Sequence, residues 1–194
     1  MYDKMLVIQL KGVIFLLKSS DTALVLIDYQ GKLANVMHEK DVLENKMMSL
    51  IQGAQLLEIP IIWMEQYPQG LGPTAPYIQE LLTDNEPIAK MDFSACQHED
   101  FQEKIQSLNR KNIIVAGIEA HICVYQTVKE LLANDYYVEY VCDAISSRTA
   151  ENKQIAIHKM NGLGALPTSV EMFLFELMGS AKHPSFKQIS KLIK

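Results

Sequence analysis

Strand-length apolar runs alternate with helix-length segments along most of this chain, and this alternation constrains the fold more than any other feature. The run Thr22–Ile27 is almost wholly apolar and ends at Asp28, and Ile59–Met64 and Asn112–Ala116 have a similar character. Runs that are apolar on both faces are typical of the central strands of a parallel sheet. Their alternation with helices of about ten or more residues predicts a parallel sheet covered on both faces.

The predicted elements fill the chain without a linker, a repeat or a low-complexity stretch, so we predict one domain over residues 1–194. The predicted strands are Thr22–Ile27, Ile59–Met64, Pro87–Ala89, Asn112–Ala116, Tyr136–Val141 and Ala165–Leu166. The predicted helices are Asp41–Leu57, Pro76–Leu82, Glu99–Leu108, Ala120–Ala133, Ala150–Met160, Ser169–Met178 and Ser185–Ile193. The Gly- and Pro-rich segment Gln66–Pro76 is predicted to be a loop.

Composition excludes several classes of function. The net charge is −5 and no long basic run occurs, which argues against nucleic acid or an anionic membrane as the main partner. No GxGxxG or P-loop motif is present, so we predict no cofactor. The three cysteines, Cys96, Cys123 and Cys142, cannot all pair within one chain and lack zinc-binding spacing. Free thiols suit a reducing compartment, so we expect a cytoplasmic protein.

Residues 1–17 form a largely apolar N-terminal arm, for which we consider two interpretations. Met5–Leu17 is largely apolar, but Lys11 interrupts it, and it falls short of the ~20 apolar residues of a membrane-spanning helix. A signal peptide is one interpretation, although no small-residue cleavage site stands out. We favour the other, an extra strand or an arm that packs on another subunit.

Cys123 is the residue that points most directly to chemistry. A buried-strand run ends at Gly117, and helix-compatible sequence resumes around Ala120. The thiol therefore falls where a strand passes into a helix N-terminus, with its unpaired N–H groups and positive dipole end. This position predicts a lowered thiol pKa, which would make Cys123 a nucleophile. The alternative is an inert core cysteine.

Two further side chains occupy equivalent positions on other strands. Asp28 and Lys90 each follow a predicted strand at or just past its carboxyl end, where open parallel sheets bind ligands. Three strands thus bring an acid, a cation and the Cys123 thiol to one rim. His121 is excluded as the base, because side chains two residues apart on a helix do not face each other. Asp28 could instead cap a helix, and Lys90 could be an ordinary solvated lysine.

Three motifs carry a resemblance to a known family: Leu24–Gln30 (LVLIDYQ), Ala89–Ser94 (AKMDFS) and Val115–Cys123 (VAGIEAHIC). In order and spacing they resemble the isochorismatase-like cysteine hydrolase superfamily, which includes nicotinamidases and N-carbamoylsarcosine amidases. The segment Glu65–Thr74 is most similar to a subgroup of uncharacterised isochorismatase-domain hydrolases. The expected fold is a three-layer α/β/α Rossmann-like domain with a mostly parallel six-stranded sheet of order 3-2-1-4-5-6.

The resemblance also implies roles for individual residues. It implies a catalytic triad of Asp28, Lys90 and Cys123. It further implies a cis peptide bond between Ile118 and Glu119 and an oxyanion hole made by the backbone N–H groups of Glu119 and Cys123. Two residues that flank the triad, Gln30 and Phe93, are predicted to contact substrate. A homo-oligomer is also expected from the family.

Two departures from relatives shape the expected reaction. Metal-binding nicotinamidases carry an Asp and closely spaced His residues after the second strand, whereas this chain has Glu65 there and no His between His38 and His98, so we predict no metal. True isochorismatases lack the nucleophilic cysteine. Its presence points to covalent hydrolysis of a small amide-like or related acyl substrate. A non-catalytic flavodoxin-like binding module and a redox-active thiol protein are the rival hypotheses.

Overall fold

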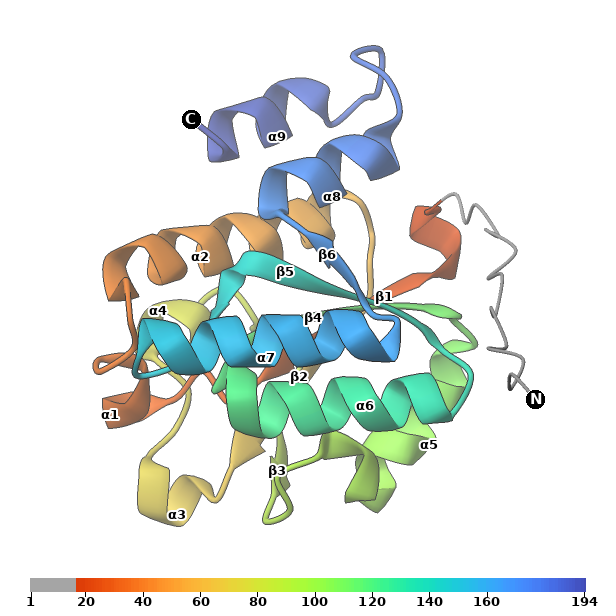
Figure 1. Cartoon of the computed structure of the whole chain (residues 1–194). Helices are drawn as coiled ribbons and strands as arrows, with labels where there is room; N and C mark the ends of the chain where they lie inside the picture. Colours follow the sequence, from red (N-terminus) through yellow and green to blue (C-terminus); the bar gives the residue numbers. More distant parts are fainter. Residues whose placement is uncertain (1–16) are drawn as a thin grey trace, which may run out of the picture.

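A computed structural model of the protein describes residues 17–194 and contains one six-stranded sheet (Figure 1). Its strands are β1 (Thr22–Ile27), β2 (Ile61–Gln66), β3 (Ile88–Lys90), β4 (Asn112–Ile118), β5 (Tyr137–Ser146) and β6 (Leu166–Thr168). All pairs are parallel and the order is β3-β2-β1-β4-β5-β6, which confirms the predicted fold. The predicted N-terminal arm lies outside the described residues except for Leu17, which is buried.

The strand order places β1 and β4 at the centre of the sheet. The strands that follow β1 in the sequence, β2 and β3, extend to one edge, and those that follow β4, β5 and β6, extend to the other. Leu24 of β1 pairs with Ile61 of β2 on one side and with Ile114 of β4 on the other. Every residue of β1, β2 and β4 is buried, as expected for strands covered on both faces. The carboxyl ends of β1 and β4 therefore define the crevice in which doubly wound sheets bind ligands.

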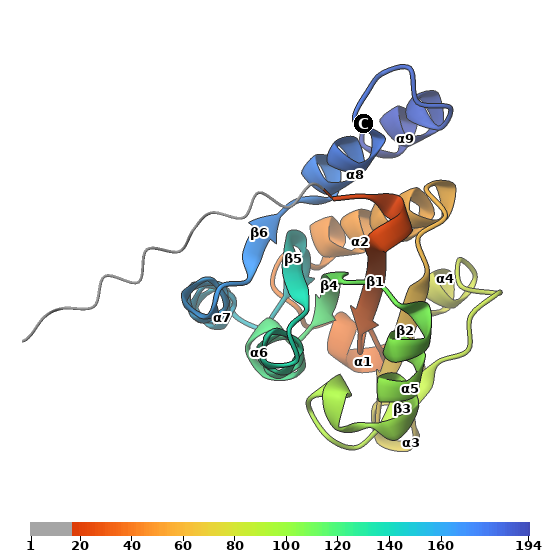
Figure 2. The ribbon, with the colours of Figure 1, turned by 90° about the vertical axis from the view of Figure 1, so that its right-hand side faces the viewer.

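Helices cover both faces of the sheet. The α-helices are α1 (Gly31–Ala34), α2 (Lys40–Leu56), α3 (Pro68–Leu71), α4 (Pro76–Gln79), α5 (Glu99–Leu108), α6 (Tyr125–Ala133), α7 (Ala150–Leu163), α8 (Val170–Met178) and α9 (Phe186–Leu192). Short helical segments are η1 (Ser19–Asp21), η2 (Ala95–Gln97) and the π-helical η3 (Ala120–Val124). Figures 1 and 2 show α2 and α8 on one face and α6 and α7 on the other.

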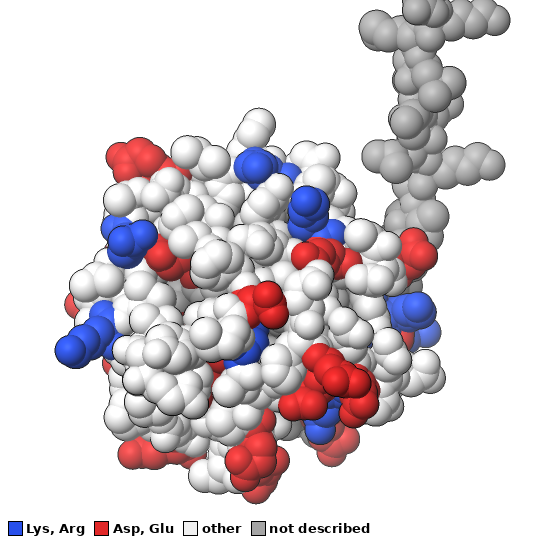
Figure 3. All heavy atoms as spheres, turned by 90° about the horizontal axis from the view of Figure 1, so that it is seen from below, with Lys and Arg blue, Asp and Glu red and all other residues white. Residues whose placement is uncertain are grey.

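The surface agrees with the charge pattern of the sequence. Figure 3 shows acidic and basic side chains interspersed among neutral ones on the face seen from below, without a continuous basic band. No helix within residues 17–194 combines the length and the apolar character needed to cross a bilayer.

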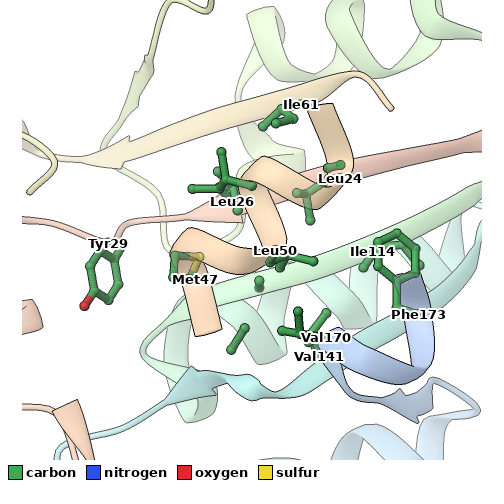
Figure 4. Close-up of a cluster of buried hydrophobic side chains, with 14 of the residues drawn as sticks. Leu24, Leu26, Tyr29, Met47, Leu50, Ile61, Ile114, Val141, Val170 and Phe173 are labelled. Atoms are coloured by element: carbon green, nitrogen blue, oxygen red, sulfur yellow. The ribbon is translucent and has the colours of Figure 1, made fainter. Parts of the chain in front are cut away.

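The hydrophobic core consists of two clusters separated by the sheet, because alternate residues of a strand point to opposite faces. Leu24 of β1 faces Leu50 of α2 and Phe173 of α8 in the cluster shown in Figure 4. Val25 of β1 lies in the other cluster, with Phe101 of α5. Each large apolar side chain that is fully buried stabilises the fold by roughly 1.5–3 kcal/mol. The two clusters therefore hold the strand ends in place.

Several segments differ from the prediction, and β2, for example, ends at Gln66 instead of Met64. β5 was expected to end at Val141 but continues to Ser146, past a register shift against β4 between Val115 and Gly117. The short helix α3 lies inside the segment Gln66–Pro76 that was expected to be a loop. The helix expected from Ala120 begins with a π-helical turn, and the regular α-helix starts only at Tyr125.

Candidate active site

Three strand ends bring Asp28, Lys90 and Cys123 together at the β1/β4 crevice. Asp28 follows β1, Lys90 ends β3, and Cys123 lies in η3, directly after β4. The Lys90 Nζ donates to Asp28 Oδ2 at 2.7 Å, and both side chains are almost completely buried. Asp28 and Cys123 line the same cavity. The structure therefore places the three predicted residues at one site.

The backbone around Cys123 depends on Gly117. Gly117 has φ +126°, a conformation that side chains rarely adopt, and a Cβ there would overlap the backbone oxygen of Ile27. The glycine lets β4 approach β1 closely at the strand ends. The next peptide bond, between Ile118 and Glu119, is cis, as the resemblance implied. The backbone N–H of Glu119 donates no hydrogen bond to any other residue of the described chain.

Lys90 is held by four oxygen atoms. Its Nζ donates to Asp28 Oδ2 at 2.7 Å and to Gln66 Oε1 at 2.6 Å, and it lies 3.3 Å from the backbone oxygens of Asp92 and Phe93. A buried ammonium is stable only when it is paired and hydrogen-bonded in this way. The ammonium therefore has a fixed position, and its charge acts on the two acidic groups beside it.

Gln66 is a site residue that the sequence interpretation missed. It is the last residue of β2, and its side-chain oxygen accepts from Lys90 and lies 3.9 Å from Cys123 Sγ. Its Nε2 donates to the backbone oxygen of Met91 at 2.7 Å, which fixes the orientation of the amide. The signal that could have found it is its place at the carboxyl end of a central strand, whereas the sequence analysis assigned it to a loop.

The two predicted substrate contacts have different surroundings. Phe93 lines the cavity and is 54% exposed. Gln30 is fully buried, and its amide bonds to the backbone: Nε2 donates to Gln66 O at 3.1 Å and to Gly72 O at 2.7 Å, and Oε1 accepts from Gln66 N at 2.6 Å. Gln30 does not line the cavity wall. It connects the end of β2 to the following loop.

The cavity beside Cys123 has a volume of about 120 Å³. Its polar lining comes from Asp28, Gln66, Glu119 and Cys123. A larger cavity of about 250 Å³ lies beside Cys96 and α5. We assign the site to the smaller cavity, because there a thiol, a carboxylate and a buried ammonium meet.

The protonation of the site departs from the sequence prediction. Burial raises the pKa of the Cys123 thiol to about 12, and the Asp28 carboxylate adds to this effect, while Lys90 opposes it. Burial also raises the pKa of Asp28 above its usual range, against the attraction of Lys90. The predicted lowering of the thiol pKa is therefore wrong for the resting site. Desolvation and neighbouring acids outweigh the helix N-terminus.

The remaining polar side chains near the site bond to one another. His121 Nδ1 lies 2.9 Å from Ser147 Oγ. Glu119 Oε2 accepts from the backbone N of Arg148 at 3.0 Å and from its Nε at 3.1 Å.

Glu65, the acidic residue that follows the second predicted strand, bonds within the fold. Glu65 Oε1 accepts from Thr74 N at 2.6 Å, so the carboxylate is used within the fold. Residues 17–194 contain no group of three His, Cys, Asp or Glu side chains arranged to hold a metal ion.

The fold and this site define a class of three-layer α/β proteins, those with the isochorismatase-like hydrolase fold. The family model described as "Isochorismatase domain" matches residues 22–172. The chain therefore belongs to the isochorismatase family. The human isochorismatase domain-containing protein 2 is 36% identical over 175 residues, which are 89% of this chain and 83% of that protein.

Solved structures agree with this assignment. The structure entitled MAR1 ribonuclease from Caenorhabditis elegans is 37% identical, with a TM-score of 0.86 over 91% of each chain. The YcaC protein of Escherichia coli, described as an octameric hydrolase of unknown specificity, has a TM-score of 0.87 at 23% identity and covers 91% of this chain and 88% of its own. The second likeness bears on the fold alone.

Proposed function

We propose that this chain hydrolyses the C–N bond of a small amide or related acyl compound through a thioester on Cys123. Asp28 acts as acid and base, and Lys90 stabilises negative charge. The observation that carries the proposal is the meeting of Asp28, Lys90 and Cys123 at one cavity, with Lys90 Nζ 2.7 Å from Asp28. Membership of the isochorismatase family supports a hydrolase.

The number of protons at the site explains how a thiol with a raised pKa can act. Lys90 supplies one positive charge, whereas Asp28 and Cys123 together can lose two protons. Loss of both leaves a net negative charge in a buried place, which is why the pKa of Cys123 rises to about 12. Transfer of the thiol proton to Asp28 gives a thiolate without changing the net charge. Burial raises the pKa of both groups, so the transfer exchanges one buried anion for another beside Lys90.

Acylation then follows from the geometry. Cys123 Sγ attacks the carbonyl carbon, its proton passes to Asp28, and the carbonyl oxygen becomes an oxyanion. The C–N bond breaks as protonated Asp28 donates its proton to the departing amine. The products are a thioester on Cys123, ionised Asp28 beside Lys90, and a free amine.

Water completes the cycle. Asp28, again ionised, accepts a proton from water as the water oxygen attacks the thioester carbonyl. The C–S bond then breaks, the carboxylic acid leaves, and Cys123 regains its proton from Asp28.

We assign the oxyanion to the backbone N–H groups of Glu119 and Cys123. The Glu119 N–H makes no hydrogen bond within the described chain, so it is available to a ligand. Removal of one such donor typically lowers the rate by about 10²–10³-fold.

Ammonia release from a panel of small amides tests this proposal. With any amide that is hydrolysed, Cys123→Ala, Asp28→Asn and Lys90→Met are each expected to lower kcat/KM by at least about 10³-fold. Cys142→Ala, which removes a partly exposed thiol away from the cavity, is the matched control and is expected to keep full activity. Full activity in all three site variants would overturn the triad.

The rival functions predict different results. A redox-active thiol would be oxidised and reduced reversibly without amide turnover, and a binding module would bind ligand equally well after Cys123→Ala. Because the similar C. elegans protein is called a ribonuclease, RNA is a necessary member of the panel. We expect no cleavage of RNA, because the net charge is −5.

We also propose that the chain acts as a homo-oligomer in a reducing compartment. The apolar side chains of Leu166 on β6 and Met172 on α8 are 45% and 59% exposed. The family resemblance and these exposed apolar side chains support a contact between subunits. The three thiols are free, as a reducing compartment would keep them.

A further inference from the structure

The walls of the cavity beside Cys123 are mainly apolar. Leu33, Leu71, Phe93, Ile118 and Ile122 supply them, from five different segments of the chain. Ile118 is fully buried, whereas Leu71 and Phe93 are 36% and 54% exposed. The cavity therefore runs from a buried end at the thiol to an apolar mouth.

No positive charge faces the space inside. Among the described residues that line the cavity, none is a Lys, an Arg or a His. Lys90 lies behind Asp28 and Gln66, and its four oxygen partners already surround it. Arg148, 58% exposed at its side chain, bonds to Glu119 through Nε and does not line the cavity.

The charged side chains that line the space are acidic, and Lys90 acts on it only from behind Asp28 and Gln66. Asp28 and Glu119 line the cavity, and Glu65 is close enough to raise the pKa of Asp28. A carboxylate or phosphate inside would lose its hydration, meet these acids and find no cation in return, which is unfavourable.

From this lining we infer the substrate class of the proposed hydrolase: the cavity accepts a short, uncharged, apolar acyl group and excludes anionic ones. That the bound group is an acyl group rests on the proposed function, whereas the preference of the cavity for uncharged molecules does not. A volume of about 120 Å³ corresponds to roughly four water molecules in the liquid, so the acyl group is small.

A series of amides that differ only in charge tests the inference. Butanamide, succinamate and 4-aminobutanamide share a four-carbon chain and end in a methyl, a carboxylate and an ammonium group. We expect kcat/KM for butanamide to exceed that of succinamate by at least about 100-fold, with 4-aminobutanamide disfavoured less, because the acidic lining does not repel an ammonium group. Among the uncharged amides, kcat/KM should rise about fourfold per methylene from acetamide to butanamide. Succinamate hydrolysed as well as butanamide in a Cys123-dependent reaction would overturn the inference and leave the proposed function standing.

A substitution at the mouth of the cavity tests whether an added cation lets the site accept an anionic amide. Leu71→Arg adds a cation to the wall and is expected to raise kcat/KM for succinamate at least tenfold relative to butanamide. Val36→Arg adds the same charge at a side chain that is 56% exposed and outside the cavity, and it should leave the ratio unchanged.

Alkylation of Cys123 measures the selectivity without any turnover. Iodoacetamide and iodoacetate carry the same reactive carbon, and only the second is an anion. Relative to the urea-unfolded chain, we expect native Cys123 to favour iodoacetamide at least tenfold, with the modified residue identified by mass spectrometry. Equal relative rates, or no reaction with either reagent, would overturn the inference even if the amide panel showed activity. The expected ratio without any amide turnover would overturn the proposed function alone.

Discussion

The burial of Cys123 and the Asp28 carboxylate beside it determine how the reactivity of the thiol should depend on pH. The pKa of the thiol is raised to about 12, first by burial and then by the Asp28 carboxylate. We therefore expect the rate of alkylation by iodoacetamide to keep rising above pH 9, where an ordinary thiol with a pKa of about 8.5 has levelled off. The measurement is the alkylation rate at Cys123 between pH 6 and pH 11.

Asp28→Asn distinguishes the effect of the Asp28 carboxylate on the thiol pKa from the effect of burial alone. The substitution removes the carboxylate that raises the thiol pKa and leaves Lys90, which lowers it. The midpoint of alkylation is expected to fall by at least about one pH unit, although turnover is lost. An unchanged midpoint would mean that Asp28 does not act on the thiol.

Gln66 couples Lys90 to the sulfur, and we expect it to be a positioning residue. Its Oε1 lies 2.6 Å from Lys90 Nζ and 3.9 Å from Cys123 Sγ. Gln66→Glu places a carboxylate at this point, which competes with Asp28 for Lys90 and adds negative charge beside the thiol. The acidic limb of the pH–rate profile is expected to move to higher pH, with kcat lowered by about 10–100-fold.

Gln66→Met separates charge from shape. It keeps a side chain of similar length but removes the acceptor, so kcat should fall while the pH profile moves less than with Gln66→Glu. Equal pH profiles for the wild type and Gln66→Glu would show that Gln66 has only a structural role.

At the residue scale, the sequence was sufficient to find side chains whose position follows from a strand end. Asp28 directly follows β1 and Lys90 ends β3, whereas Cys123 lies beyond the end of β4, at the passage from strand to helix. The family motifs added the prediction that the three act together, and the prediction of Lys90 rested largely on them. The second strand was expected to end two residues before Gln66, so Gln66 was missed. The thiol pKa was predicted in the wrong direction, because burial and the approach of Asp28 come from contacts between distant segments.

At the element scale, the junction of β1 and β4 depends on Gly117. A Cβ at Gly117 would overlap the backbone oxygen of Ile27, and φ +126° is unfavourable for any other residue. We expect Gly117→Ala to lower the free energy of unfolding by about 3 kcal/mol or more and to displace the Glu119 N–H. Urea denaturation measures the first effect and kcat of the folded fraction the second.

Gly162 provides the matched control. It lies in α7 and a Cβ there meets no atom within 4 Å. Gly162→Ala is therefore expected to stabilise the protein by about 0.5–1 kcal/mol, because alanine has the higher helix propensity. Equal destabilisation by both substitutions would show that the close approach of β1 and β4 is not the cause.

The differences between predicted and observed elements have local causes. Apolar periodicity predicted α5 with the observed bounds, Glu99–Leu108, because its buried side chains repeat at helical spacing. The same criterion could not separate the π-helical turn Ala120–Val124 from α6, since both have helical spacing. It also ended β5 at Val141, because the less apolar pair Cys142 and Asp143 interrupts the run inside the strand.

At the scale of the whole molecule, the strand order determines where chemistry can occur. From β1 and β4 the strand order proceeds to opposite edges of the sheet, and the site lies at that switch point, although Lys90 comes from the edge strand β3. Lys90 reaches Asp28 because its side chain is long and fully buried. The site therefore depends on the complete half-sheet β3-β2-β1, and damage to β3 would separate the ion pair without touching Cys123.

The opposite edge of the sheet bears on the assembly of the molecule. β6 is a short edge strand, and Leu166 on β6 and Met172 on α8 are exposed apolar side chains. We expect the wild-type protein to form a closed oligomer in solution, with Met172 in the contact. Met172→Glu adds charge at this side chain and should lower the mass measured by light scattering, whereas Val42→Glu, at an exposed side chain of α2, should not. A wild-type mass equal to that of one chain, 22.0 kDa, would contradict the proposed homo-oligomer. An oligomer that survives Met172→Glu would instead assign the contact to another surface.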